Sequence, residues 1–147
     1  MENYELVEIL FAEDNARDAE LTIRALKQGG LANALLWVKD GQQAMDFLFR
    51  QGEYAGREDT VPRLVLLDLK MPRVDGIEVL EAIRRDERTK NIPVVIMTSS
   101  EEESDVARSY ALGVNSYVVK PVDFNAMVDV ARHAGYYWLA VNKTPSH

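Results

Sequence analysis

Polar side chains that can do chemistry follow four apolar runs of this chain. In chain order these side chains are Glu13 and Asp14, Asp68, Thr98 and Lys120. In an open parallel sheet the carboxyl ends of the strands form the ligand crevice, so we expect these groups to meet at one edge. Three carboxylates, one hydroxyl and one amine are suited to binding a divalent cation and a phosphoryl group.

The three acids Glu13, Asp14 and Asp68 favour a metal site only when they are considered together. Taken alone, the acidic pair is more readily a loop acid followed by a helix cap, and Asp68 is more readily a loop residue. Carboxylates that converge at one place repel one another unless a cation neutralises them. A ligand set made only of oxygen atoms favours Mg²⁺, which also keeps waters and phosphate oxygens as ligands.

Lys120 and Thr98 each have an ordinary interpretation and a functional one. A lysine between an apolar strand and Pro121 is usually a solvated strand end, but beside three acids it can act as a point charge for phosphate. A threonine at a strand end more often begins a helix, but its hydroxyl can also bond a phosphoryl oxygen. The residues alone leave both choices open.

Composition excludes several classes of protein. The 147 residues suit one domain, and 47% hydrophobic with 28% charged residues is ordinary for a globular chain. The net charge of −7 argues against binding nucleic acid or an anionic membrane surface. The absence of cysteine excludes disulfides and thiol chemistry. No segment has the length of a membrane span and no signal peptide is evident, so a cytoplasmic protein is expected.

Five apolar runs alternate with five helical patterns along the chain. The predicted strands cover residues 6–12, 34–38, 63–67, 92–97 and 116–119. The predicted helices follow capping residues at Asn15, Asp40, Asp75, Ser100 and Asp123. Residues 53–62 are predicted to form a loop. Such alternation predicts a parallel α/β sheet covered on both faces, with right-handed crossovers.

As a set, the polar residues and their neighbours resemble the receiver domain of two-component response regulators. The residues that carry the resemblance are Glu13-Asp14, Asp68-x-x-Met71-Pro72-x-x-Asp75-Gly76, Thr98, Tyr117 and Lys120-Pro121. The resemblance covers roughly residues 5–134 and implies a flavodoxin-like (βα)5 doubly wound sheet with strand order 2-1-3-4-5. It also implies a cis bond before Pro121. The chain would divide into a receiver domain at 1–134 and an extension of its last helix at 135–147.

The resemblance assigns the phosphoacceptor and the metal ligands. Asp68 would accept a phosphoryl group from a sensor histidine kinase or a histidine phosphotransfer protein. Glu13, Asp14 and Asp68 would hold Mg²⁺ together with the backbone carbonyl of Lys70. Transfer of this kind mainly requires positioning and neutralisation of charge.

The resemblance also assigns a switch. Lys120 would pair with the phosphoryl oxygens, the hydroxyl of Thr98 would move toward them, and the ring of Tyr117 would turn inward. The charge added by phosphorylation would then bias a two-state surface. The protein would be a phosphoacceptor signalling protein and not an enzyme, because it would catalyse only its own phosphorylation and dephosphorylation.

The C-terminal segment is aromatic and apolar. Its candidate interface residues are Tyr136, Tyr137, Trp138, Leu139 and Val141. These residues either fold back on their own domain or form a protein interface, where tyrosine and tryptophan are enriched. The segment is similar to that of single-domain regulators that partner bacterial phytochromes, which implies a homodimer and a phytochrome-type kinase. No output domain is expected to follow.

Three other functions remain as alternatives. A scaffold that does not use phosphorylation would share the fold, but such proteins usually lose an acid or the lysine. A phosphatase with an aspartyl-phosphate intermediate would carry a second aspartate two residues after the nucleophile, where this chain has Lys70. A flavin-binding protein of this fold would need a Ser/Thr/Gly-rich phosphate loop after the first strand, and residues 13–16 do not provide one.

Two charged runs favour surface positions. The acids at residues 101–103 suit the positive end of a helix dipole. Arg84, Arg85, Arg88 and Lys90 are expected to form a solvated basic face.

Overall fold

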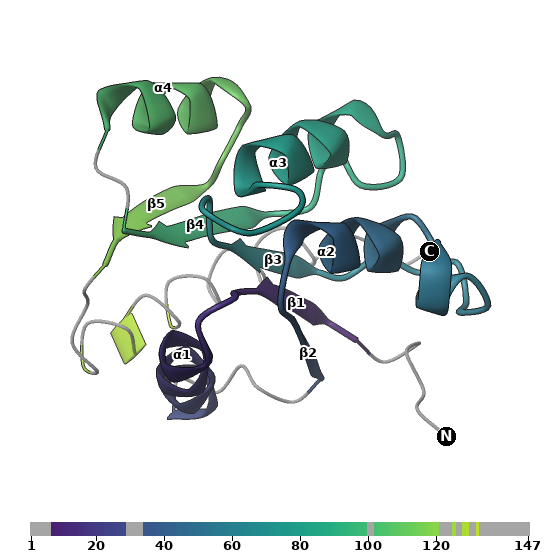
Figure 1. Ribbon diagram of the computed structural model, residues 1–147, viewed down its shortest axis with the longest axis horizontal. Helices are drawn as coiled ribbons and strands as arrows, with labels where there is room; N and C mark the ends of the chain where they lie inside the picture. The colour runs from purple at the N-terminus through teal and green to yellow at the C-terminus, as the bar shows by residue number, and fades with distance from the viewer. Residues whose placement is uncertain are drawn as a thin grey trace.

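The computed structural model describes residues 7–28, 34–99 and 102–120, together with residues 125, 128, 129 and 132. Within these residues β-strands and α-helices alternate along the chain (Figure 1). The strands are β1 (Ile9–Ala12), β2 (Leu35–Val38), β3 (Leu64–Leu67), β4 (Val94–Thr98) and β5 (Ser116–Val119). The helices are α1 (Ala16–Gln28), α2 (Gly41–Leu48), α3 (Gly76–Arg85) and α4 (Glu103–Ala111). A 3₁₀ turn, η2 (Gly52–Tyr54), overlaps the start of the predicted loop.

The strands form one parallel sheet in the order β2-β1-β3-β4-β5, which confirms the predicted topology. Ala12 at the end of β1 lies level with Leu67 at the end of β3, and Thr98 lies level with Val119. β1 and β3 therefore end together, as do β4 and β5, and β4 extends two residues beyond Ile96, which lies level with Leu67. These parallel strands share one carboxyl edge. The polar residues that follow these strands leave the sheet at that edge.

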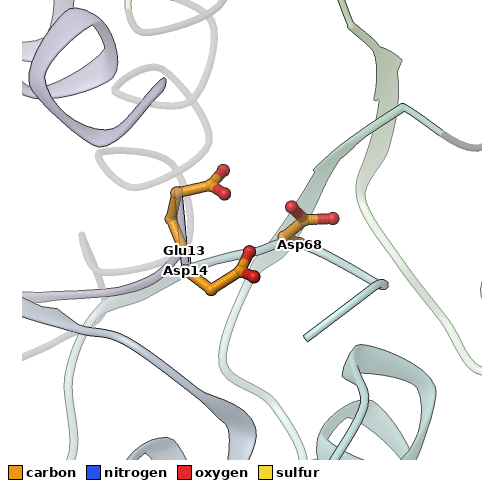
Figure 2. A group of neighbouring side chains, drawn as sticks. All are labelled: Glu13, Asp14 and Asp68. Atoms are coloured by element: carbon orange, nitrogen blue, oxygen red, sulfur yellow. The ribbon is translucent and has the colours of Figure 1, made fainter. Parts of the chain in front are cut away.

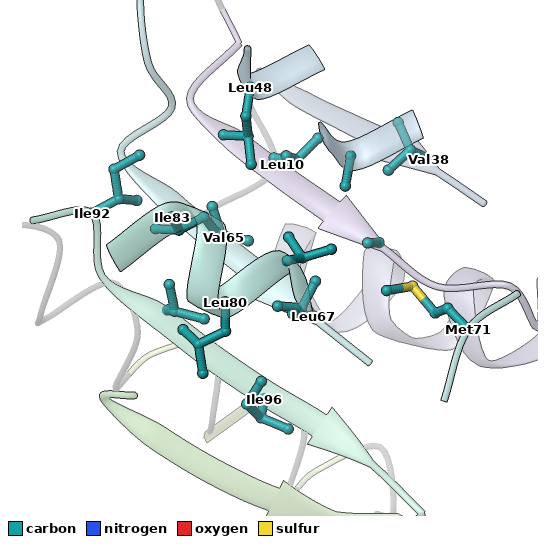
Figure 3. Packing of buried hydrophobic residues seen from close by; sticks show 14 of the residues in the cluster. Leu10, Val38, Leu48, Val65, Leu67, Met71, Leu80, Ile83, Ile92 and Ile96 are labelled. Atoms are coloured by element: carbon teal, nitrogen blue, oxygen red, sulfur yellow. The ribbon is translucent and has the colours of Figure 1, made fainter. Parts of the chain in front are cut away.

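The core consists of two hydrophobic clusters, one on each face of the sheet. Alternate strand residues supply them: Val65 and Leu67 belong to the cluster under α2 and α3, whereas Leu64 and Leu66 belong to the cluster under α1. Figure 3 shows the first cluster, with strand and helix side chains meeting between the layers. Strands buried on both faces are continuous apolar runs, which explains why no polar alternation marks them in the sequence.

Side-chain caps begin α1, α2 and α3, as predicted. Asn15 accepts a hydrogen bond from the Asp18 N–H at 2.9 Å, and Asp40 accepts one from the Gln43 N–H at 2.8 Å. Asp75 accepts one from the Glu78 N–H at 3.0 Å. A cap of this kind satisfies an N–H group that has no partner within the helix.

The start of α4 differs from the prediction, so the assignment of Ser100 as its cap is wrong. The helix begins at Glu103, and Glu102 is its N-cap residue, whose side chain makes no capping hydrogen bond to the helix. The reason lies in the backbone. Glu102 is extended, with ψ of 131°, and its carbonyl accepts the first helical bonds from Asp105 and Val106. A helix that included Ser100 would have to continue through this extended residue.

The prediction of a solvated basic face is wrong for Arg84. Its guanidinium is partly buried and donates to the carbonyl oxygens of Lys90, Ile92, Leu112 and Gly113 at 2.7–3.1 Å. Burial also lowers the pKa of Arg84. The side chain therefore joins the segments that precede β4 and β5. Arg85 is exposed, as expected.

Several predictions fall outside the described residues. They are the cis bond before Pro121, the cap at Asp123 and the interface residues of the C-terminal segment. Val128 is helical and buried in the cluster under α1. Within the described ranges, no helix has the length and apolar character needed to cross a membrane.

Candidate functional site

The three predicted acids lie together at the carboxyl edge of the sheet. Glu13, Asp14 and Asp68 each place a carboxylate oxygen within 4.8 Å of the others, as Figure 2 shows at the ends of β1 and β3. Glu13 and Asp68 are buried, with 2% and 6% of their surfaces exposed, whereas Asp14 is exposed. Two carboxylates are therefore withdrawn from water while the third faces it.

Backbone hydrogen bonds fix these positions. The Asp68 N–H donates to the Ala12 carbonyl at 3.1 Å, which continues the pairing of β1 and β3 past the last strand residue. The Trp37 indole N–H donates to the Glu13 carbonyl at 2.8 Å, and the Asn15 N–H donates to Glu13 Oε2 at 3.1 Å. The buried Glu13 is thus held through both its backbone and its side chain.

Lys120 lies among these acids. Its Nζ is 2.6 Å from Glu13 Oε1, 3.1 Å from Asp68 Oδ2 and 3.0 Å from Asp18 Oδ2. Its backbone N–H donates to the Thr98 carbonyl at 2.7 Å, which places the residue beside the end of β4. An ammonium has three N–H donors, so these carboxylates engage all of them. The predicted meeting of Lys120 with the acids is confirmed.

The electrostatics of the cluster leave an excess of negative charge. Burial raises the pKa of Glu13 to about 7, opposed by the hydrogen bond from Lys120 and supported by the charge of Asp68. Burial alone would lower the pKa of Lys120, but hydrogen bonds to Glu13 and Asp18 and the charge of Asp68 raise it instead. Glu13, Asp14, Asp18 and Asp68 contribute four carboxylates against one ammonium. Because these carboxylates repel one another and two of them are buried, the site is suited to a further cation.

The donor set agrees with a hard divalent cation. The three clustered ligands are carboxylates, and neither histidine nor cysteine takes part in the cluster. Mg²⁺ and Mn²⁺ both prefer such oxygen ligands. The Lys70 N–H donates to Asp68 Oδ1 at 3.2 Å, so the backbone turns beside the carboxylate. The role of the Lys70 carbonyl as a ligand stays a prediction.

The loop between β3 and α3 passes close under Asp68. A Cβ atom at Gly76 would overlap the Asp68 carbonyl oxygen, so only glycine fits this position. The Gly76 N–H donates to the Leu69 carbonyl at 2.9 Å and closes the loop. On its other side the loop reaches α4, where Lys70 Nζ lies 3.4 Å from Asp105 Oδ2. The loop that carries the acid thus contacts a neighbouring helix.

Thr98 and Tyr117 lie on adjacent strands near the same edge. Thr98 is fully buried at the end of β4, and Tyr117 is half-buried on β5, level with Ile96. Tyr117 packs against the hydrophobic cluster under α2 and α3. Their predicted action as a switch is a statement about motion and remains a prediction.

Two residues of the site escaped the sequence analysis. Asp18 binds Lys120, and Trp37 binds the backbone of Glu13. The signal for Asp18 was its place as an acid in the first turn of α1, the helix that begins just after the acidic pair. No sequence signal marked Trp37, because its contact depends on the pairing of β1 with β2.

The chain is similar in sequence to known response regulators. The response regulator receiver domain family matches residues 9–132. A probable methanogenesis regulatory protein, FilR2 of Methanothrix harundinacea, is 43% identical over 93% of this chain and 86% of its own length. Response regulator Rcp1 of Synechocystis is 38% identical over 94% of this chain and 92% of its own length.

Solved structures agree with these matches. The Mn²⁺-bound form of Rcp1 has a TM-score of 0.79 at 38% identity, covering 94% of this chain and 98% of that one. The phosphorylated cyanobacterial phytochrome response regulator RcpA has a TM-score of 0.79 at 36% identity, covering 95% of this chain and 99% of that one. With the site geometry, these matches show that the chain belongs to the response regulator receiver domain family.

Proposed function

We propose that this receiver accepts a phosphoryl group on Asp68 from a histidine kinase or a histidine phosphotransfer protein. The observation that carries the proposal is the Asp68 carboxylate itself. It is buried, it lies 3.1 Å from Lys120 Nζ, and it shares a cluster with two other carboxylates. In the transfer, an Asp68 oxygen forms a bond to phosphorus as the N–P bond of the phosphohistidine breaks. The imidazole nitrogen keeps that electron pair and takes up a proton.

The residues of the site divide the work of this transfer. Glu13, Asp14 and Asp68 would hold Mg²⁺, with the Lys70 carbonyl as a further ligand. The bound cation supplies positive charge to the phosphoryl oxygens. Lys120 supplies a second positive charge beside Asp68, and its raised pKa keeps it protonated across the physiological range. Positioning and charge neutralisation of this kind are the main requirements of phosphoryl transfer.

The proposed output is a change in protein contacts. The phosphoryl group would draw the hydroxyl of Thr98 toward it, and the ring of Tyr117 would follow. The positions of these residues support the proposal, since they lie on adjacent strands near the edge that carries Asp68. The Lys70–Asp105 ion pair connects the same loop to α4 and gives the change a second route.

The resemblance to RcpA, a phytochrome response regulator, supports a phytochrome-type kinase as the input. FilR2, which is similar in sequence, is a probable methanogenesis regulatory protein and not one named for a phytochrome. We further propose a cytoplasmic homodimer that uses Tyr136, Tyr137, Trp138, Leu139 and Val141 as its interface, with residues 1–134 as the receiver domain. Light scattering at micromolar concentration tests the dimer, and a monomer mass would contradict it.

Intact mass spectrometry after incubation with acetyl phosphate and Mg²⁺ tests the phosphoacceptor. We expect one phosphoryl adduct on the wild type and none on Asp68→Asn. Asp75→Asn is the matched control, because Asp75 lies in the same loop and caps α3, and this variant should still be labelled. Addition of EDTA should prevent labelling of the wild type.

Equal labelling of Asp68→Asn would reject Asp68 as the acceptor. A wild type that takes no label from the small donor or from a histidine kinase would favour a scaffold. A phosphatase is disfavoured because Lys70, at the position of its general acid, is held toward Asp105 on α4. Continuous release of phosphate from added phosphomonoesters would overturn that conclusion.

A further inference from the structure

Lys120 contacts two kinds of carboxylate. Glu13 and Asp68 belong to the three-carboxylate cluster that could hold a cation, whereas Asp18 does not. Among the described residues, Asp18 is therefore the one partner of the Lys120 ammonium that a cation in this cluster leaves in place. We propose that Asp18 is a positioning residue, which anchors Lys120 over Asp68 while Glu13 and Asp68 bind the cation. The proposal rests on the proposed function of Asp68.

Asp18 is well placed to be an anchor. It lies in the first turn of α1, and its N–H donates to Asn15 Oδ1 at 2.9 Å. The next residue, Ala19, is fully buried and fixes the helix against the sheet. Asp18 has a short side chain with few rotamers, so a rigid helix turn holds its carboxylate at a defined place. Its Oδ2 lies 3.0 Å from Lys120 Nζ.

The anchor is needed because a divalent cation competes with Lys120. A divalent cation bound to the Glu13 and Asp68 carboxylates neutralises part of their negative charge. Two of the three contacts of the Lys120 ammonium are then weaker. Lysine carries a flexible stem, and ordering such a side chain costs rotamer entropy. A remaining partner outside the cation cluster keeps Nζ near the oxygen that receives the phosphoryl group. With 39% of its side chain exposed, Asp18 can do this without being buried as an unpaired charge.

The primary test is the rate of phosphorylation by acetyl phosphate at saturating Mg²⁺. We expect Asp18→Ala to lower that rate several-fold to tenfold, even when more Mg²⁺ is added. Asp18→Asn should fall between Asp18→Ala and the wild type, because it keeps an acceptor oxygen and loses the charge. Glu20→Ala is the matched control, since Glu20 is an exposed acid of the same helix that is not a partner of Lys120.

A double-mutant cycle with Lys120→Met identifies the route of the effect. If Asp18 acts through Lys120, Asp18→Ala should change the rate little in the Lys120→Met background. If Asp18→Ala lowers the rate by the same factor in both backgrounds, or if Glu20→Ala has the same effect, the charge of α1 is responsible and the inference is wrong. Thermal unfolding of each variant shows that the rates refer to folded protein.

The outcomes separate this inference from the proposed function. A wild type that is never phosphorylated overturns both. A wild type that is labelled on Asp68, together with an Asp18→Ala variant labelled at the same rate, overturns the anchor alone. Restoration of the rate by extra Mg²⁺ would also overturn it, because Asp18 would then act on cation affinity and not on Lys120.

Discussion

Lys120 and Arg84 are cations at opposite edges of the same sheet, and their surroundings differ in kind. Lys120 follows β5 and is bound by three carboxylates, with a fourth carboxylate, Asp14, in the adjoining cluster. Arg84 lies near the start of β4 and β5 and donates to four carbonyl oxygens. Both side chains are partly withdrawn from water, and both join segments far apart in the sequence.

The difference separates a reactive site from a structural one. Carbonyl oxygens are neutral, so the partners of Arg84 bring no excess negative charge that would attract a further cation. The carboxylates around Lys120 outnumber it, so that edge keeps an attraction for cations even when every ammonium donor is engaged. A partly buried cation thus indicates chemistry when its partners carry more charge than it can neutralise, and it indicates structure when they carry none.

Replacing Lys120 should give the largest effect. In Lys120→Met the rate of phosphorylation from acetyl phosphate should fall by roughly 10²–10³, the usual effect of removing one charge-stabilising donor. The remaining carboxylates would also repel one another, so the variant should unfold more easily in EDTA than in Mg²⁺. Rate measurements and thermal unfolding with and without Mg²⁺ check both effects. A variant that is phosphorylated at the normal rate would remove Lys120 from the site.

Replacing Arg84 should lower the stability of the protein and leave its phosphorylation rate unchanged, the reverse of the main effect expected at Lys120. Arg84→Met leaves up to four carbonyl oxygens without their donor and should lower the free energy of unfolding by about 2–4 kcal/mol. Its phosphorylation rate per folded molecule should remain normal, and Mg²⁺ should not selectively restore its stability. Urea unfolding and the acetyl phosphate assay measure the two quantities. A slow rate in folded Arg84→Met would show that the two edges are coupled, and the contrast would fail.

The pH dependence of Mg²⁺ affinity at the carboxyl edge should give a smaller effect than the replacement of Lys120 or Arg84. Burial raises the pKa of Glu13 to about 7, so this carboxyl binds a proton as pH falls below that value. A proton and a cation compete for the same oxygens, and apparent Mg²⁺ affinity should fall by up to about tenfold per pH unit below 7. Calorimetric titrations at pH 8, 7 and 6 measure this. Glu13→Gln should bind Mg²⁺ more weakly, with a flatter pH dependence.

The smallest effect is expected at Arg73, which lies at the carboxyl edge outside the acidic cluster. Its guanidinium donates twice to Asp40 at 3.2 Å, but the pair is largely solvated on the Arg73 side. Arg73→Ala should therefore lower stability by less than about 1 kcal/mol. Because Arg73 has a φ of 69°, Arg73→Gly should be less destabilising than Arg73→Ala. A large loss of phosphorylation in either Arg73 variant would show that the site extends along the carboxyl edge of the sheet, beyond the acidic cluster.

The strand ends could be predicted from the sequence because they depend on chain order and register. Once Asp68 and Glu13 are known to follow parallel neighbouring strands, their meeting follows. The contact of Asp18 with Lys120 could not be predicted, because it depends on how α1 is rotated on the sheet and how a long side chain bends. Arg84 was misjudged for a similar reason, since one of its acceptors, Leu112, lies 28 residues away. The partners of Arg84 are backbone carbonyl oxygens, which every residue carries, so no charge pattern in the sequence indicates them.

The bond from Trp37 to the Glu13 carbonyl has a practical consequence. An indole is a fluorophore, and here its N–H is attached to the backbone of a residue proposed to hold the cation. The chain thus carries its own optical reporter 24 residues from Glu13 in sequence but joined directly to it in space. The sequence has one other tryptophan, Trp138, and Trp138→Phe would remove that background emission. Occupancy of the acidic edge could then be followed in real time, in unlabelled protein, while a kinase acts on it.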